Sequence, residues 1–152
     1  FFSTDGDRVE YNKGIYTQFK NGSAFRRFNQ TGRLLEWRAA NGIVHRVKRN
    51  VAGHPVSWSN NKGARLAIQT DPASGRITSI RFPGRGIFHY QYFGQNLVFV
   101  KQPGGFEWSY LYDDLHNLTR TSSTEGFVES VSYDKLRDEV LSVQRDLIKE
   151  IR

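Results

Sequence analysis

Hydrophobic and polar side chains alternate in short runs along this chain, and the segment from 106 to 112 shows the pattern most clearly. Its aromatic residues are separated by single, mostly polar residues: Phe106, Trp108, Tyr110 and Tyr112. This is the period of a strand with one face buried. Asp113 and Asp114 follow, and Asp side chains often bind the backbone of a tight turn. A second short run, 117–121, comes next, so the segment predicts a β-hairpin.

The same arrangement recurs through most of the chain. Glycines stand at positions 22, 42, 63, 84, 105 and 126, in steps of 20 and then 21 residues. Each interval holds a strand-like run, a turn and a second strand-like run. The turns are expected near Gln30-Thr31, Val51-Ala52, Ala73-Ser74, Gly94-Gln95 and Leu115-His116. An isolated hairpin is marginal in water, so we expect neighbouring hairpins to bury one another's faces.

The turns resemble the YD repeat of the Rhs family, in which an aromatic residue and Asp are followed by two residues, Gly, Arg or Asn, and Leu. The segment "YDDLHNL" matches best, with His116 at the glycine position, and "FNQTGRL" keeps the Gly-Arg-Leu part. The segments "TDPASGRI" and "YFGQNL" are one residue longer and one shorter. The pattern covers roughly residues 22–143. The alternative is an ordinary antiparallel β domain whose glycine turns happen to recur.

The resemblance implies an all-β fold in which repeated antiparallel hairpins form a curved sheet. Rhs-family proteins include bacterial polymorphic toxins, insecticidal toxin shells and the adhesive teneurins. By resemblance, residues 1–134 are a hairpin-repeat domain of a non-catalytic shell, scaffold or recognition module. Its partners are expected to be neighbouring repeats or domains of a larger chain, and its location secreted or at the cell surface. The chain has no Met, which is consistent with a processed chain or a piece of a longer protein, and no Cys, which rules out disulfides and thiol metal ligands.

The last segment, 135–152, departs from the repeat. Its apolar residues have helical spacings: Leu136, Val140, Val143, Leu147, Ile148 and Ile151. Acidic residues stand early in it and basic residues late, which suits the dipole of a helix. We therefore expect a C-terminal helix, which could cap the last hairpin, join oligomers or serve as a linker.

Charge is uneven along the chain. Residues 1–104 hold sixteen Lys and Arg against five Asp and Glu, whereas residues 105–152 hold six against ten, within a net charge of +7. Equivalent repeat positions carry cations, at Arg38, Arg81 and Lys101, next to the aromatic residues Trp37 and Trp58. These five residues form a candidate binding stripe for an anionic glycan or another surface polymer. Nucleic acid is a weaker candidate. The alternative is a charged surface that keeps the sheet soluble and deters strand pairing.

Catalytic motifs are not found in the sequence. The four histidines fall in four different repeats, and no zinc-protease, nucleophile-elbow or phosphate-loop motif occurs. We therefore expect no enzyme activity, no cofactor, no metal and no membrane span, while an enzyme with a site dispersed among loops remains the second alternative. Trp37, Trp58 and Trp108 are expected to be largely buried.

Overall fold

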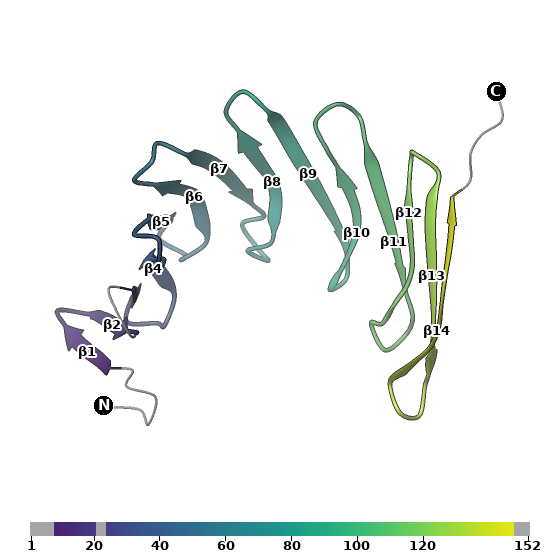
Figure 1. Cartoon of the computed structure of the whole chain (residues 1–152), viewed down its shortest axis with the longest axis horizontal. Coiled ribbons are helices and arrows are strands. Elements are labelled where there is room, and N and C mark those ends of the chain that lie inside the picture. The colour runs from purple at the N-terminus through teal and green to yellow at the C-terminus, as the bar shows by residue number, and fades with distance from the viewer. Residues whose placement is uncertain (1–7, 21–23, 148–152) are drawn as a thin grey trace. The chain divides into compact units, whose positions relative to one another are not determined.

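The computed structural model describes residues 8–20 and 24–147. These residues form fourteen β-strands, and no helix occurs among them (Figure 1). The strands belong to two units, residues 1–84 (unit 1) and 85–152 (unit 2). The predicted all-β class of repeated antiparallel hairpins is confirmed.

Unit 1 contains eight strands, each antiparallel to the next in the chain. They are β1 (Arg8–Asn12), β2 (Ile15–Phe19), β3 (Phe25–Phe28), β4 (Leu34–Arg38), β5 (Val44–Arg49), β6 (Pro55–Asn60), β7 (Arg65–Thr70) and β8 (Ile77–Phe82).

Unit 2 contains six strands with the same neighbour-to-neighbour pairing. They are β9 (Gly86–Phe93), β10 (Asn96–Lys101), β11 (Glu107–Tyr112), β12 (Leu118–Ser123), β13 (Phe127–Asp134) and β14 (Glu139–Leu147).

All five turns expected from the repeat are present. Four of them, and a further one before β14, begin with an Asn or Asp whose side chain accepts hydrogen bonds from backbone N–H groups later in the turn. We call these the capped turns, and their first residues are Asn29, Asn50, Asp71, Asp113 and Asp134. In "YDDLHNL", His116 has a φ of 67°, so it adopts the left-handed backbone that Gly32, Gly53 and Gly75 adopt in other copies.

A β-bulge accompanies each of the six hairpins from β3–β4 to β13–β14 that close at this edge of the repeat, whereas the β1–β2 hairpin has a regular register. In each, the second strand has one extra residue close to the turn: Leu35, Val56, Thr78, Val98, Thr119 and Leu141. The extra residue reverses the alternation of side chains. Leu34 pairs with Phe28 and Trp37 with Arg26, so Leu34 and Trp37 share a face although they are three positions apart.

The pairing also assigns the two faces of unit 1. Its apolar face carries Trp37, His45, Val47, Trp58, Leu66, Ile68 and Ile80, and its polar face carries Arg27, Glu36, Arg46, Lys48, Ser57, Ser59, Arg65, Ala67 and Arg81. On the apolar face, the His45 ring lies between two indole rings, with ring centres 4.5 Å from Trp37 and 5.4 Å from Trp58. These three rings form a continuous stack across β4, β5 and β6.

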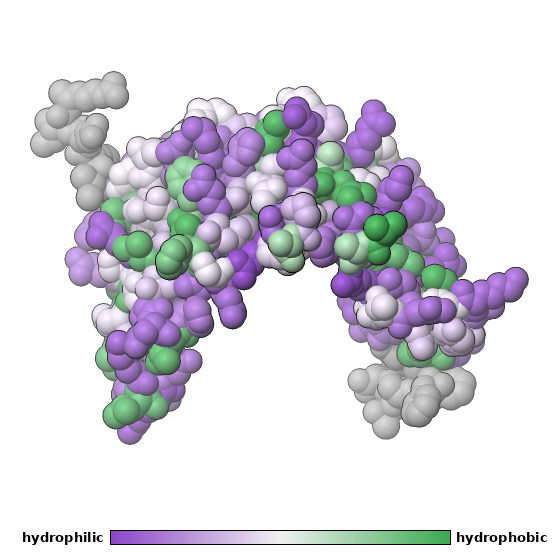
Figure 2. All heavy atoms as spheres, turned by 180° about the vertical axis from the view of Figure 1, so that it is seen from behind, coloured by the Kyte–Doolittle hydropathy of each residue, from purple (hydrophilic) through white to green (hydrophobic). Residues whose placement is uncertain are grey.

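Burial is shallow throughout. Among the described residues, Val44, Val100 and Ser79 alone are classed as buried. Trp37, Trp58 and Trp108 are neither fully buried nor exposed, so their burial is incomplete. The reason is that a sheet buries a face fully when a second layer covers it. Figure 2 shows hydrophilic and hydrophobic residues interspersed over one side of the molecule.

The predicted C-terminal helix is also wrong where the structure describes it. Residues Glu139–Leu147 form β14, which pairs with β13 from Asp134–Glu139 to Phe127–Leu147. The bulge at Leu141 places Val140 and Val143 on one face, opposite Tyr133 and Val131. A bulged strand therefore reproduces the three-residue spacing of a helix. Ile148 and Ile151 lie outside the described residues.

Candidate functional site

The polar face of unit 1 is hollowed. A groove of about 720 Å³ extends over β1–β6 and includes Arg27, Glu36, Arg46, Lys48, Ser57 and Ser59 in its lining. A second hollow of about 340 Å³ shares Ser57 and Ser59 and continues to Arg65, Ala67 and Arg81. The two hollows therefore meet over β6, between strands that carry cations.

One carboxylate lies in this groove, between two guanidinium groups. Arg27 Nη1 donates to Glu36 Oε1 at 3.0 Å, and Arg46 Nε donates to Glu36 Oε2 at 2.6 Å. The Glu36 side chain is 15% exposed, whereas those of Arg27 and Arg46 are 50% and 60% exposed. The three residues lie opposite one another on β3, β4 and β5. This surface can hold a carboxylate by charge-assisted hydrogen bonds.

The two hollows also contain cations without a carboxylate partner. Lys48, Arg65 and Arg81 are exposed and form no ion pair with the described residues. No Asp or Glu occurs in strands β5–β8. Like charges concentrated on a concave surface raise the local concentration of anions. The polar face between β5 and β8 is therefore a candidate anion-binding surface.

The predicted stripe of cations is placed differently. Arg38 is half-buried, and its guanidinium lies 5.2 Å from the centre of the Phe25 ring. Lys101 belongs to unit 2 and is paired with Glu107 at 2.7 Å. Arg81 is exposed and lines the second hollow. Equivalent repeat positions occur on every second strand, so their separation is about 10 Å per repeat.

The predicted tryptophans are separated from the cations by the sheet. Trp37 precedes Arg38 on β4, and Trp58 lies between Ser57 and Ser59 on β6. Successive residues of a strand point to opposite faces, so both indoles belong to the apolar face. The combined stripe of cations and aromatic rings is thus divided between two faces. Five further cations line the hollows that the sequence pattern did not indicate: Lys13, Arg27, Arg46, Lys48 and Arg65.

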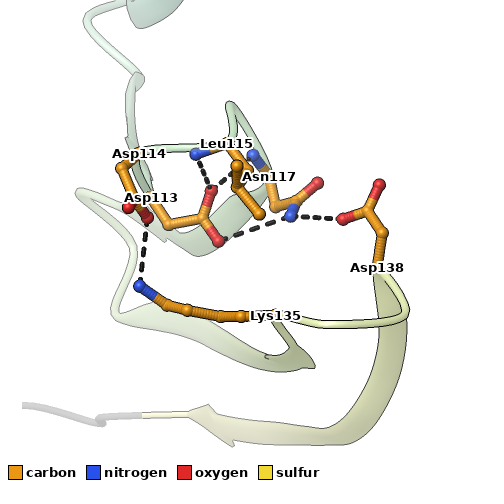
Figure 3. A network of polar contacts seen from close by, with 6 residues as sticks. All are labelled: Asp113, Asp114, Leu115, Asn117, Lys135 and Asp138. Carbon is orange, nitrogen blue, oxygen red and sulfur yellow. Dashed lines mark hydrogen bonds and ion pairs between the residues drawn. The ribbon is translucent and has the colours of Figure 1, made fainter.

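The Asp113-Asp114 pair has a structural role in its turn (Figure 3). Asp113 Oδ1 accepts from the backbone N–H groups of Leu115 and Asn117, each at 2.9 Å. Asp114 pairs with Lys135 of the next capped turn at 3.0 Å. The side-chain hydrogen bond, and to a smaller extent the attraction between the two charges, lowers the pKa of Asp114 and raises the pKa of Lys135. The pair therefore caps one turn and joins it to the next.

Contacts between successive turns recur within each unit. Arg33 Nη1 donates to the carbonyl of Ala52 at 2.8 Å, and the His54 ring lies against Gly75. In unit 2, Asn117 Nδ2 donates to Asp138 Oδ1 at 2.6 Å, as Figure 3 shows. His116 Nδ1 is 2.9 Å from Asn96 Oδ1. In three of these contacts, the residue that directly follows a left-handed residue contacts the next turn at the same edge. Arg33 contacts the residue before the left-handed Gly53, and His54 contacts the left-handed Gly75. Asn117 contacts the left-handed Asp138. The Arg or Asn of the repeat motif therefore links successive repeats.

Where glycine occupies the left-handed position, the neighbouring side chain uses the space. A Cβ atom on Gly53 would lie 1.5 Å from Nη1 of Arg33. At the corresponding positions in unit 2, His116 and Asp138 instead form side-chain hydrogen bonds with Asn96 and Asn117. The long side chain of Arg33 thus lies against a glycine. The short amide side chains of Asn96 and Asn117 instead lie against the polar residues His116 and Asp138.

The histidines do not form a common site among the described residues. His45 stacks between tryptophans, His54 lies against Gly75 and His116 bonds Asn96. No group of three His, Asp or Glu residues that could hold a metal occurs within 8–20 and 24–147. The same residues contain no helix of the length and hydrophobicity needed to cross a membrane.

No protein-family model and no curated protein matches the chain. Solved structures with the same fold include TcdB2–TccC3 without its hypervariable C-terminal region, with a TM-score of 0.55 and 13% identity over 90% of this chain. The TcdB2–TccC3–TEV structure gives 0.53 and 13% over 89%. The chain spans 9% of the length of either protein. At this identity the likeness shows the fold alone, and it supports the Rhs-like fold implied by the turns.

Proposed function

We propose that this chain is a non-catalytic structural segment of a larger wall of β-hairpins, as in Rhs-family shells. The proposal rests on the single layer of strands within each unit, and among the described residues Val44, Val100 and Ser79 are the only buried ones. A domain of this size normally buries a core between two layers. A sheet with two uncovered faces is better suited to a wall that continues into further repeats.

The edge strand β14 supports the same proposal. All nine of its residues are exposed, including Val140, Leu141 and Leu147 at 56%, 66% and 73%. Among the described residues β14 pairs with β13 alone. Such an edge presents unpaired backbone groups and is a template for another strand. Further hairpins of a longer chain would cover it without any new type of contact.

The wider setting follows from the resemblance and belongs to the same proposal. The partners of this segment would be neighbouring repeats or domains of its own chain, and the whole protein would be secreted or displayed at the cell surface. The dispersed histidines support a role without catalysis. Recognition of an anionic partner is the second candidate, favoured by the acid-free strands β5–β8.

The local stability of β13 and β14, compared between a short and a long form of the protein, tests the proposal. The 152-residue chain and the full-length gene product would be compared by hydrogen exchange of the β13 and β14 amides and by binding of an apolar dye. We expect faster exchange and stronger dye binding in the shorter protein, because its edge and faces lack their cover. Equal protection and no dye binding in the shorter protein would show a self-contained domain and overturn the proposal.

A further inference from the structure

Strands β5–β8, which contain no Asp or Glu, form a trough with cations on both sides. Its floor consists of Ser57 and Ser59 on β6, with Ala67 beside them on β7. Arg46 and Lys48 on β5 line one side. Arg65 on β7 and Arg81 on β8 line the other. Because the floor side chains are small, an anionic group can approach the cations from above β6.

The trough has the dimensions of one extended polypeptide. Arg46 and Arg65 are two strands apart and therefore about 10 Å apart, whereas Lys48 and Arg81 are three strands apart and therefore about 15 Å apart. Arg46 and Lys48 are two residues apart and therefore repeat at about 6.6 Å along the strand. An extended peptide lying along β6 has the same period, since its alternate side chains also repeat every two residues. Consecutive acidic residues would then reach the two sides in turn.

The floor can also bind the backbone of such a peptide. When the side chains of an extended chain point toward the two sides of the trough, its backbone N–H and C=O groups point toward and away from the floor. The hydroxyls of Ser57 and Ser59 can donate to or accept from these groups. The aromatic rings lie on the opposite face, whereas single-stranded nucleic acids are usually held by bases stacked on aromatic rings. A polypeptide therefore fits this face better than a nucleic acid.

Glu36 shows how a carboxylate binds at one end of this surface. It accepts from both Arg27 and Arg46, and the Arg46 guanidinium keeps further N–H donors. Lys48, Arg65 and Arg81 have no equivalent carboxylate within the described residues. The geometry points to a binding site for an extended acidic polypeptide, whose consecutive Asp or Glu residues pair with Arg46 and Lys48 on one side and Arg65 and Arg81 on the other. This inference does not depend on the proposed wall.

Two labelled octapeptides of equal charge test the spacing. One has four consecutive glutamates flanked by serines, and the other has glutamate and serine in alternation. Fluorescence anisotropy with the 152-residue chain should show tighter binding of the consecutive peptide, by about threefold, because alternate glutamates reach one side alone. Binding should weaken from low to physiological salt, since exposed charges are screened over about 8–10 Å. Equal affinities for the two peptides would overturn the inference.

Paired variants test the residues. Arg65→Gln with Arg81→Gln should weaken binding of the consecutive peptide about tenfold, from two exposed contacts of ordinary strength. The matched control, Arg26→Gln with Lys62→Gln, removes the same charge from the apolar face and a turn, and should change the affinity by less than about twofold. Equal losses in the two double variants would show a general charge effect and contradict the site.

A variant that should bind the peptide more tightly distinguishes a true binding site from the effects of a damaged fold. Glu36→Gln frees Arg46 from its internal carboxylate and should tighten binding of the consecutive peptide about twofold to threefold. No change or a loss in this variant would count against a competition between Glu36 and the ligand. A sulfated glycan or a single-stranded DNA of matching charge serves as a competitor. If either binds more tightly than the consecutive peptide, the assignment to a polypeptide is wrong.

Discussion

Units 1 and 2 are built from the same hairpins but balance their charges differently. Residues 1–84 hold fourteen Lys and Arg against five Asp and Glu, whereas residues 85–152 hold eight against ten. In unit 2, Lys101, Lys135 and Arg145 each pair with a carboxylate. In unit 1, strands β5–β8 contain no carboxylate. The fold thus depends on the turns and the apolar positions, while the polar face varies without changing it.

The largest expected change in the free energy of unfolding tests whether the sheet lacks a covering layer in both units. Trp58→Ala in unit 1 and Trp108→Ala in unit 2 should each lower the free energy of unfolding by about 2–3 kcal/mol, below the ~3–5 kcal/mol typical of fully buried aromatic residues. Both indoles are half-buried against one aromatic neighbour. Urea unfolding of each variant measures the change. A loss in the higher range for one of them would reveal a covering layer in that unit.

The next effect isolates the contact between successive turns in unit 1. Gly53→Ala should cost about 2–3 kcal/mol, because it strains a left-handed residue and displaces Arg33 from the carbonyl of Ala52. Gly32→Ala is the matched control, with φ of 74° and no atom within 4 Å of the added Cβ. It should cost about 1–2 kcal/mol. If unfolding in urea gives equal losses for the two variants, the Arg33 contact contributes nothing.

Unit 2 offers the reverse substitution at the same repeat position. His116→Gly removes the strain of a left-handed non-glycine residue and also removes the hydrogen bond to Asn96. The two effects are each about 1 kcal/mol and opposite in sign, so the free energy of unfolding should change by less than about 0.5 kcal/mol. The double variant His116→Gly with Asn96→Ala separates them. A further loss above about 1 kcal/mol in the double variant would show that Asn96 has another role.

The smallest expected effect is the dependence of thermal stability on acidic pH. Hydrogen bonds from the Ser74 hydroxyl and backbone, above all, lower the pKa of Asp71. A carboxyl with a lowered folded-state pKa stabilises the fold above its unfolded value, near pH ~4, and this contribution is lost as pH falls through the lowered value. The difference in melting temperature between the parent and Asp71→Asn should therefore shrink as the pH falls below ~4. A constant difference down to pH ~2 would contradict the assignment.

The sequence predicted the hairpins better than their surfaces. Glycine spacing and the Asn and Asp positions located the turns because both act locally, through left-handed backbone and side-chain capping. The bulges were missed, and with them the true nature of β14, because the spacing of Val140 and Val143 also fits a helix. The i, i+3 spacing of Leu34 and Trp37 was the signal that could have revealed them.

The candidate site was predicted less well, for a reason that concerns register. Arg38, Arg81 and Lys101 were aligned by repeat position, but partners across neighbouring strands decide which cations are neutralised. Glu107 neutralises Lys101, and the Phe25 ring contacts Arg38. The trough combines Arg46 and Lys48 with Arg65 and Arg81 from different repeat positions. Strand pairing was needed to bring these four together.

The most direct test of the account is the structure of the full-length gene product by electron cryomicroscopy. We expect residues 8–20 and 24–147 to lie within a continuous single layer of β-hairpins, with the free edge of β14 paired to a following strand. A compact arrangement in which a second layer from within these residues covers Trp58 and Trp108, with β14 left at an edge, would contradict it.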